Sequence, residues 1–243
     1  IIGGASLAGR RWGPVVSGWL IGLPLTSGPV VFFVILSHDE AFAASTVLGT
    51  LSGGLSLVAF CLTYAWLALR FRWPVAIGGS LLCFGCVTLL MQNLVMPLGA
   101  IFSLVLLVIL AGLWLMPKSA QLEGQDSNPG KWDLPARILI GTAFILGLTG
   151  IAPFIGPRLT GLLSTIPLYT AILTIFAHRL QGPAGAAGVL RGLLFGLFGF
   201  AGFYLALALL LGRVGVGLAF LTAILTTLLI QALSFLVLRR GQR

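Results

Sequence analysis

Residues 13–25, GPVVSGWLIGLPL, return as residues 156–168, GPRLTGLLSTIPL. Sliding the chain against itself by 143 residues aligns two glycines, two prolines and two leucines in these segments, and the alignment continues without a gap. Over residues 13–82 it gives 20 identical pairs, where chance in this composition would give about one position in ten. The sequence therefore predicts an internal repeat.

The composition is typical of a membrane protein. Hydrophobic residues make up 58% and charged residues 8% of the 243 residues, against about a quarter charged in soluble domains. We expect an all-α polytopic transmembrane bundle that forms one membrane domain, with the lipid bilayer as its main partner. The net charge of +9 is scattered between apolar runs instead of forming a basic face, which excludes a nucleic-acid-binding surface.

Apolar runs long enough to cross a bilayer, about 20 residues each, predict eight complete spans. They cover residues 14–37, 41–69, 74–91, 94–116, 136–155, 157–178, 184–212 and 214–238. The same offset sets residues 1–8 against 144–151, which predicts a truncated ninth span at the start. The polar segment 117–136 is expected to be a cytoplasmic linker between a first transmembrane repeat, 1–116, and a second, 137–243.

The basic residues predict the orientation. If Arg10 and Arg11 face the cytoplasm, twelve of the fourteen Lys and Arg residues fall on that side, and only Arg158 and Arg213 fall outside. This pattern predicts a protein of a bacterial-type inner (plasma) membrane. It also places the C-terminus in the cytoplasm. Five spans separate equivalent residues, and because five is odd the two repeats are expected to have inverted topology. An ancient duplication that serves only packing is the alternative.

Each repeat carries a proline near the middle of its best-matched span, Pro24 or Pro167. Proline removes a backbone donor and clashes with the preceding turn, so both helices should break there. Small and hydroxyl residues surround the breaks, and together they predict a polar pocket near the bilayer midplane. The expected substrate-binding residues are Pro24, Thr26, Ser27, Gly28, Ser164, Thr165, Pro167, Tyr169 and Thr170.

The chemistry expected of such a pocket is binding without catalysis. Half-helix N-termini favour an anionic group, and unwound carbonyls favour a cation. Acidic residues are confined to loops, and Cys83 and Cys86 lie in an apolar run without nearby His or carboxylate. We therefore expect no catalytic residue, no metal site and no cofactor. Gln231, the strongly polar side chain at depth, is expected to bond across helices.

The motif GP-x3-G-x-L-x3-PL in both repeats, with a five-plus-five arrangement of spans, resembles inverted-repeat secondary transporters of the bile acid symporter and cation/proton antiporter type. That resemblance implies broken helices that cross at the midplane. The families also use acidic ion ligands, which the spans of this chain lack. Another family of bacterial inner-membrane proteins with this architecture is the alternative.

Three functions follow from these patterns, in decreasing order of support. The first is a transporter or facilitator of a small anionic or neutral solute that works by alternating access. The second is a non-transporting scaffold or subunit of a membrane complex, and a homodimer is left open for either. The third is an intramembrane enzyme, which the lack of a catalytic cluster disfavours.

Overall fold

A computed structural model describes residues 7–8, 11–25, 27–37, 40–92, 94, 96–117, 139 and 167–240. This part of the chain is helical and contains no β-strand. The predicted linker 117–136 and span 136–155 lie almost entirely outside the described residues, as does the first part of the span predicted over 157–178. The helices are α2 (Pro14–Ile21), α3 (Ser27–Ser37), α4 (Glu40–Ala68), α5 (Trp73–Gln92), α6 (Leu98–Leu115), α8 (Leu168–Leu210) and α9 (Val216–Arg240).

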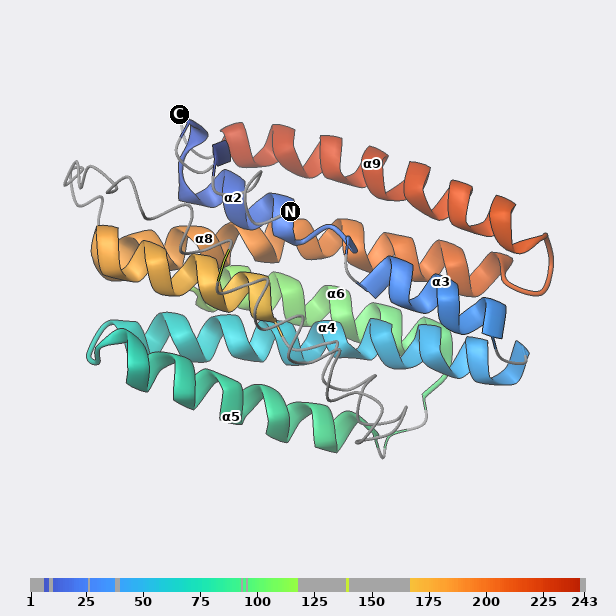
Figure 1. Ribbon diagram of the computed structural model, residues 1–243, viewed down its shortest axis with the longest axis horizontal. Coiled ribbons are helices and arrows are strands. Elements are labelled where there is room, and N and C mark those ends of the chain that lie inside the picture. Colours follow the sequence, from blue (N-terminus) through green and yellow to red (C-terminus); the bar gives the residue numbers. More distant parts are fainter. Residues whose placement is uncertain are drawn as a thin grey trace.

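The span predicted over 14–37 is interrupted, as Pro24 led us to expect. Helix α2 ends at Ile21, α3 begins at Ser27, and Pro24 lies in the non-helical segment between them. The freed backbone groups are partly satisfied locally, because the Gly28 amide donates to the Pro24 carbonyl at 2.9 Å. Helices α2 and α3 together therefore run the length of the bundle with a break near its middle (Figure 1).

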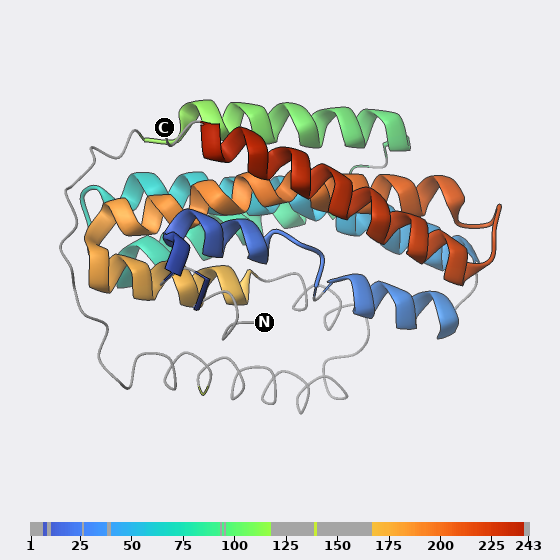
Figure 2. The same cartoon turned by 90° about the horizontal axis from the view of Figure 1, so that it is seen from above.

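Helix α8 consists of two arms. Gly182 has φ 70° and ψ −164°, outside the helical region, and Pro183 follows it. A positive φ costs glycine little, so the chain can turn sharply at this position. Figure 2 shows that it reverses there, with the first arm (168–181) and the second arm (183–210) running in opposite directions. This turn falls between the spans predicted over 157–178 and 184–212.

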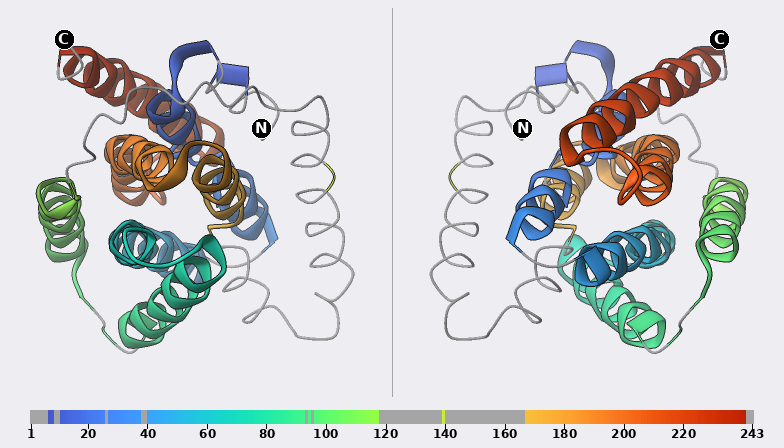
Figure 3. Two further views of the ribbon diagram at one scale, coloured as in Figure 1. Left: turned by 90° about the vertical axis from the view of Figure 1, so that its left-hand side faces the viewer. Right: turned by 90° about the vertical axis from the view of Figure 1, so that its right-hand side faces the viewer.

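Two central helices carry the core. The end-on views of Figure 3 place α4 and the second arm of α8 in the middle of the bundle, with α5, α6 and α9 around them. Of the most apolar stretch of α8, 61% is buried, against 17% for α5. The outer helices expose leucines such as Leu82, Leu107 and Leu229.

Lipid is the solvent that suits these outer faces. Five described helices are long and apolar enough to cross a membrane: α4, α5, α6, α8 and α9. An apolar helix face that no protein covers is stable in hydrocarbon and unfavourable in water. The chain is therefore an all-helical membrane-embedded protein.

Glycines let α2 cross α8 with their backbones in contact. Gly18 of α2 lies against the backbone of the second arm of α8 at Val189, and Gly22, directly after α2, lies against Gly196. A methyl group built on Gly192 would overlap the Val15 carbonyl oxygen, and one on Gly22 would overlap the Gly196 backbone. This small-xxx-small pattern on both partners is typical of close helix crossings in membranes. It fixes the interrupted helix against the central one.

Polar side chains join the outer helices to the central ones. Thr88 of α5 donates to Ser56 of α4 at 2.8 Å. On the other side, Gln231 of α9 donates to the Gly196 carbonyl of α8 at 3.2 Å, which confirms that Gln231 bonds across helices. Such bonds satisfy groups that lipid cannot.

The two ends of the bundle differ in charge. The α4–α5 turn holds Arg70 and Arg72, and the turn within α8 follows Arg179, all three exposed. These turns lie at the same end, on the left of Figure 1, and we call it the basic end. Arg213, in the α8–α9 turn, lies at the opposite end.

Candidate functional site

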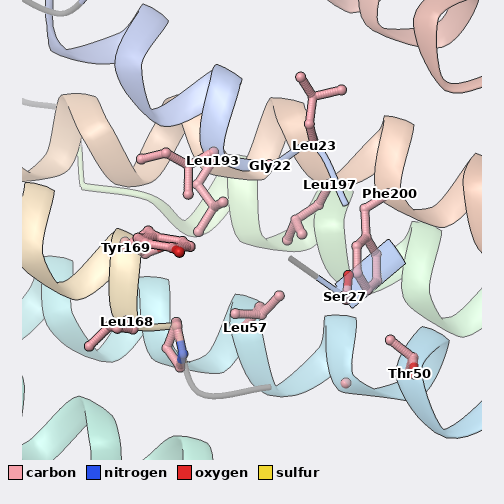
Figure 4. A pocket seen from close by; sticks show the side chains of 14 residues that line it. Gly22, Leu23, Ser27, Thr50, Leu57, Leu168, Tyr169, Leu193, Leu197 and Phe200 are labelled. Carbon is pink, nitrogen blue, oxygen red and sulfur yellow. The ribbon is translucent and has the colours of Figure 1, made fainter. Parts of the chain in front are cut away.

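A cavity of about 80 Å³ lies between the α2–α3 interruption and the start of α8. One water molecule needs about 10–15 Å³ of such volume. The cavity therefore has room for several waters, or for one small ion or molecule. Figure 4 shows the residues around it, which come from the α2–α3 segment, from α4 and from both arms of α8. They are Ile21, Gly22, Leu23, Ser27, Thr50, Gly53, Leu57, Pro167, Leu168, Tyr169, Thr170, Leu193, Leu197 and Phe200.

The cavity brings together residues predicted from both repeats. Ser27 comes from the first interruption, and Pro167, Tyr169 and Thr170 come from the start of α8. Pro24 and Gly28 are described but do not line the cavity; Gly28 packs toward the Phe203 ring instead. The predicted residues Thr26, Ser164 and Thr165 lie outside the described part.

Hydroxyl groups supply much of the polarity of the cavity. Thr170 is only 3% exposed and lines the cavity from the first turn of α8. The Tyr169 ring extends from the same turn toward the cavity centre (Figure 4). The Thr50 hydroxyl donates to the Thr46 carbonyl of its own helix at 2.7 Å, so it offers the cavity only acceptor lone pairs.

Two helix N-termini begin at the cavity. Helix α3 starts at Ser27, and α8 starts at Leu168 after Pro167, which provides no capping side chain. The first amides of a helix lack intrahelical acceptors and carry a partial positive charge. In α3 the Gly28 amide already donates to the Pro24 carbonyl and Pro29 has no amide hydrogen, so Ser27 supplies the remaining amide. The carbonyl end of α2, at Ile21 and Gly22, also reaches the cavity. The site therefore offers amide donors, hydroxyls and backbone acceptors.

The structure adds lining residues that the motif did not point to. Thr50, Gly53 and Leu57 come from α4, and Leu193, Leu197 and Phe200 come from the second arm of α8. The sequence placed both helices next to the breaks, but their long apolar runs did not indicate which face turns inward. The offset of 143 relates Thr50 to Leu193 and Leu57 to Phe200, so the repeat alignment was the sequence signal that links these positions.

A buried tyrosine approaches the cavity wall. The Tyr204 hydroxyl is fully buried and has no hydrogen-bond partner among the described residues. The hydroxyl group of Tyr204 lies close to the Ser27 side chain, but the two do not meet the geometry of a hydrogen bond. The Tyr204 ring packs on Phe200 with ring centroids 4.7 Å apart. No sequence signal had set this tyrosine apart from other residues in its apolar run.

None of the described residues that line the cavity carries a charged side chain. Among the described residues, no group of three or more His, Cys, Asp or Glu side chains is arranged to hold a metal ion. The polar groups of the cavity can bind a small solute by hydrogen bonds and by the partial charges of helix ends.

Comparison with protein-family models, with curated proteins and with solved structures finds no match to this chain.

Proposed function

We propose that the protein transports a small anionic or neutral solute across the inner membrane by alternating access, with the cavity between the α2–α3 interruption and the start of α8 as its binding site. The observation that carries this proposal is that one cavity is lined both by the α2–α3 interruption and by Pro167 with the first turn of α8. Sites at discontinuous helices near the midplane are a recurrent feature of secondary transporters.

An inverted repeat is part of the proposal, and the helix bounds support it. Adding 143 to Trp73, where α5 begins, gives Val216, where α9 begins. The same shift takes residues 40–68 of α4 to 183–211, one residue longer than the second arm of α8, 183–210. It takes residues 27–37 of α3 to 170–180, within the first arm.

The directions of these helices also support it. In Figure 1, α3 and α5 run from left to right, while their counterparts, the first arm of α8 and α9, run from right to left. Helix α4 and the second arm of α8 are likewise opposed. Two half-chains of opposite direction supply two similar conformations that open to opposite sides.

Interhelical contacts recur at matched positions. Ser56 and Thr88, which bond across α4 and α5, map by the offset to Gly199 and Gln231. The Gln231 side chain packs against Gly199, and its amide bonds to α8 one turn away, at Gly196. Each repeat therefore joins its long central helix to its outer helix at the same place.

The binding site has the same symmetry. Ser27 plus 143 gives Thr170, and both residues line the cavity with a hydroxyl group. The N-termini of α3 and of α8 begin there from opposite directions, so two positive helix ends converge. This arrangement suits a small solute that carries a negative charge or several hydrogen-bond acceptors.

The charge distribution supports an orientation. We place the basic end, with Arg70, Arg72 and Arg179, in the cytoplasm, because basic residues in short loops are retained on that side. Helix α9 ends at the same end of the bundle (Figure 1), so the C-terminus is assigned to the cytoplasm.

Purified protein reconstituted into liposomes tests the function. Uptake of a panel of radiolabelled solutes, consisting of chloride, acetate, lactate, phosphate, glycerol and alanine, is compared with uptake by protein-free liposomes. We expect at least one member to enter faster with protein present, and excess unlabelled solute to reduce that uptake.

Uptake equal to that of protein-free liposomes for every member of the panel would contradict transport. Stable co-purification with another membrane protein would then favour the scaffold function. A variant with Ser27→Ala and Thr170→Val serves as the site control, because uptake through the cavity must respond to the loss of both hydroxyls.

A further inference from the structure

A line of polar side chains leads from the cavity toward the basic end along one face of α8. Thr170, Thr174 and His178 are each four residues apart, so they follow one another on the same side of the helix, about 6 Å apart along its axis. Thr170 lines the cavity, Thr174 is fully buried, and His178 is half-buried one residue before the exposed Arg179. The line therefore connects the binding site with the surface of the bundle.

Thr174 is the unusual member of this line. Its hydroxyl is inaccessible and has no hydrogen-bond partner among the described residues. Almost all buried polar groups have a partner, and an unpaired one is destabilising. A hydroxyl held in this state one helical turn beyond Thr170, which lines the cavity, is suited to bond a solute or a water molecule that reaches it.

Tyr64 of α4 lies at the outer end of the line. Its hydroxyl and His178 Nδ1 are 3.3 Å apart, and the two rings meet edge to face. Tyr64 itself is fully buried. The pair thus joins α4 to the first arm of α8 between Thr174 and the basic end, and separating the two side chains would remove this contact between the helices.

The equivalent positions in the other repeat have a different character. Subtracting 143 from Thr174 and His178 gives Val31 and Ile35, which are apolar. Beyond Ser27, toward the opposite end, aromatic rings pack against one another, with Phe32 and Phe203 both against Phe220 at centroid distances of 4.9 and 5.9 Å. Polar side chains therefore follow the cavity on its basic side, and apolar side chains follow it on the other.

We infer that Thr170, Thr174 and the Tyr64–His178 pair form the route by which small hydrogen-bonding solutes pass between the cavity and the basic end, with the Tyr64–His178 contact as its gate. This inference rests on the proposed function, because a route is meaningful only if the cavity binds a solute. It adds that the described conformation is closed by one polar contact on the basic side.

Thiol labelling tests the route without a known solute. Cys61, Cys83 and Cys86 are replaced by alanine, and Thr174→Cys is compared with its repeat counterpart Val31→Cys. A small membrane-impermeant methanethiosulfonate reagent is applied to either side of sealed vesicles. Arg179→Cys and Val214→Cys, both at exposed positions, report which side is which.

The expected result is that Thr174→Cys reacts only from the side that labels Arg179→Cys, while Val31→Cys reacts from neither. Tyr64→Phe removes the hydroxyl that contacts His178 and should raise the rate at Thr174→Cys about fivefold, the factor that a neutral hydrogen bond contributes. Thr170→Cys provides a second position on the route if Thr174→Cys does not accumulate in the membrane.

The inference is overturned if neither Thr174→Cys nor Thr170→Cys reacts even with Tyr64→Phe, or if Val31→Cys reacts as fast as they do. If labelling follows the expected pattern while the solute panel shows no uptake, the inferred route stands and the proposed transport function is rejected. The two proposals can therefore fail separately.

Discussion

We expect single hydroxyl groups to determine what the cavity binds. Ser27 and Thr170 line it from helix N-termini that begin in opposite directions, and the described lining holds no charge that would compete with them. Selectivity should therefore depend on hydrogen bonds and helix-end charge, which are modest one by one. Small changes at these residues are expected to alter affinity before they alter folding.

Thr170→Val keeps the shape of the side chain and removes its hydroxyl. We expect the Michaelis constant for uptake to rise about two- to tenfold, as for the loss of one hydrogen bond, with unchanged protein level in the membrane. Uptake kinetics in proteoliposomes measure this. Thr222→Val is the matched control, since the Thr222 hydroxyl donates to the Leu218 carbonyl of its own helix at 2.8 Å; an equal effect in both variants would argue against a role for Thr170 in binding.

At the scale of elements, the interruption between α2 and α3 depends on Pro24. Pro24→Ala restores a backbone donor and removes the steric clash, so the gap between Ile21 and Ser27 can become helical. We expect uptake to be abolished while the protein still elutes as a monodisperse peak in detergent. Pro167→Ala should behave in the same way at the start of α8. Uptake at the normal rate in both variants would show that the breaks are dispensable.

The crossing of α2 and α8 depends on glycine. Gly192→Ala places a methyl group where the Val15 carbonyl oxygen lies, so the helices must move apart. Overpacking of this kind costs about 1–3 kcal/mol, which in a chain of this length corresponds to a melting temperature lower by roughly 2–10 °C. Thermal unfolding in detergent measures it. Gly78→Ala on α5, where a methyl group meets nothing within 4 Å, should leave the melting temperature unchanged or raise it.

Sequence reasoning predicted the elements better than their packing. Proline and glycine act on the backbone of their own segment, so the break near Pro24 and the turn at Gly182 fall between or within the spans as expected. Which faces of α4 and α8 turn toward the cavity depends on partners far away in the chain. In such apolar helices the polar residues show no periodicity that reveals the inward face. Thr50, Thr174 and Tyr204 were missed for that reason, whereas Ser27 and Thr170 were found because they lie beside the breaks.

At the scale of the whole molecule, the outer faces of α5, α6 and α9 indicate the environment. Leu229 lies in the middle of α9 and is 68% exposed, while Leu218 near the start of this helix is 59% exposed. In water both leucines could become lysine at little cost. In a bilayer, lysine at the centre of a helix costs about 3 kcal/mol and far less near the interface, where it can snorkel.

Leu229→Lys should therefore strongly reduce the amount of protein recovered in the membrane fraction, and Leu218→Lys should not. Quantitative immunoblots of alkaline-washed membranes measure both. Equal recovery of the two variants would indicate that this face of α9 is covered by protein or water and not by lipid.

The central claim is that two similar half-chains lie upside down to each other in the membrane. Phe71 and Val214 are 143 residues apart and both exposed, in the α4–α5 and α8–α9 turns at opposite ends of the bundle. In a background without native cysteine, Phe71→Cys and Val214→Cys leave the neighbouring Arg70 and Arg213 in place. A membrane-impermeant thiol reagent applied to sealed vesicles should label one position from one side only and the other from the opposite side only. Labelling of both from the same side would contradict the inverted arrangement, and with it the proposed site.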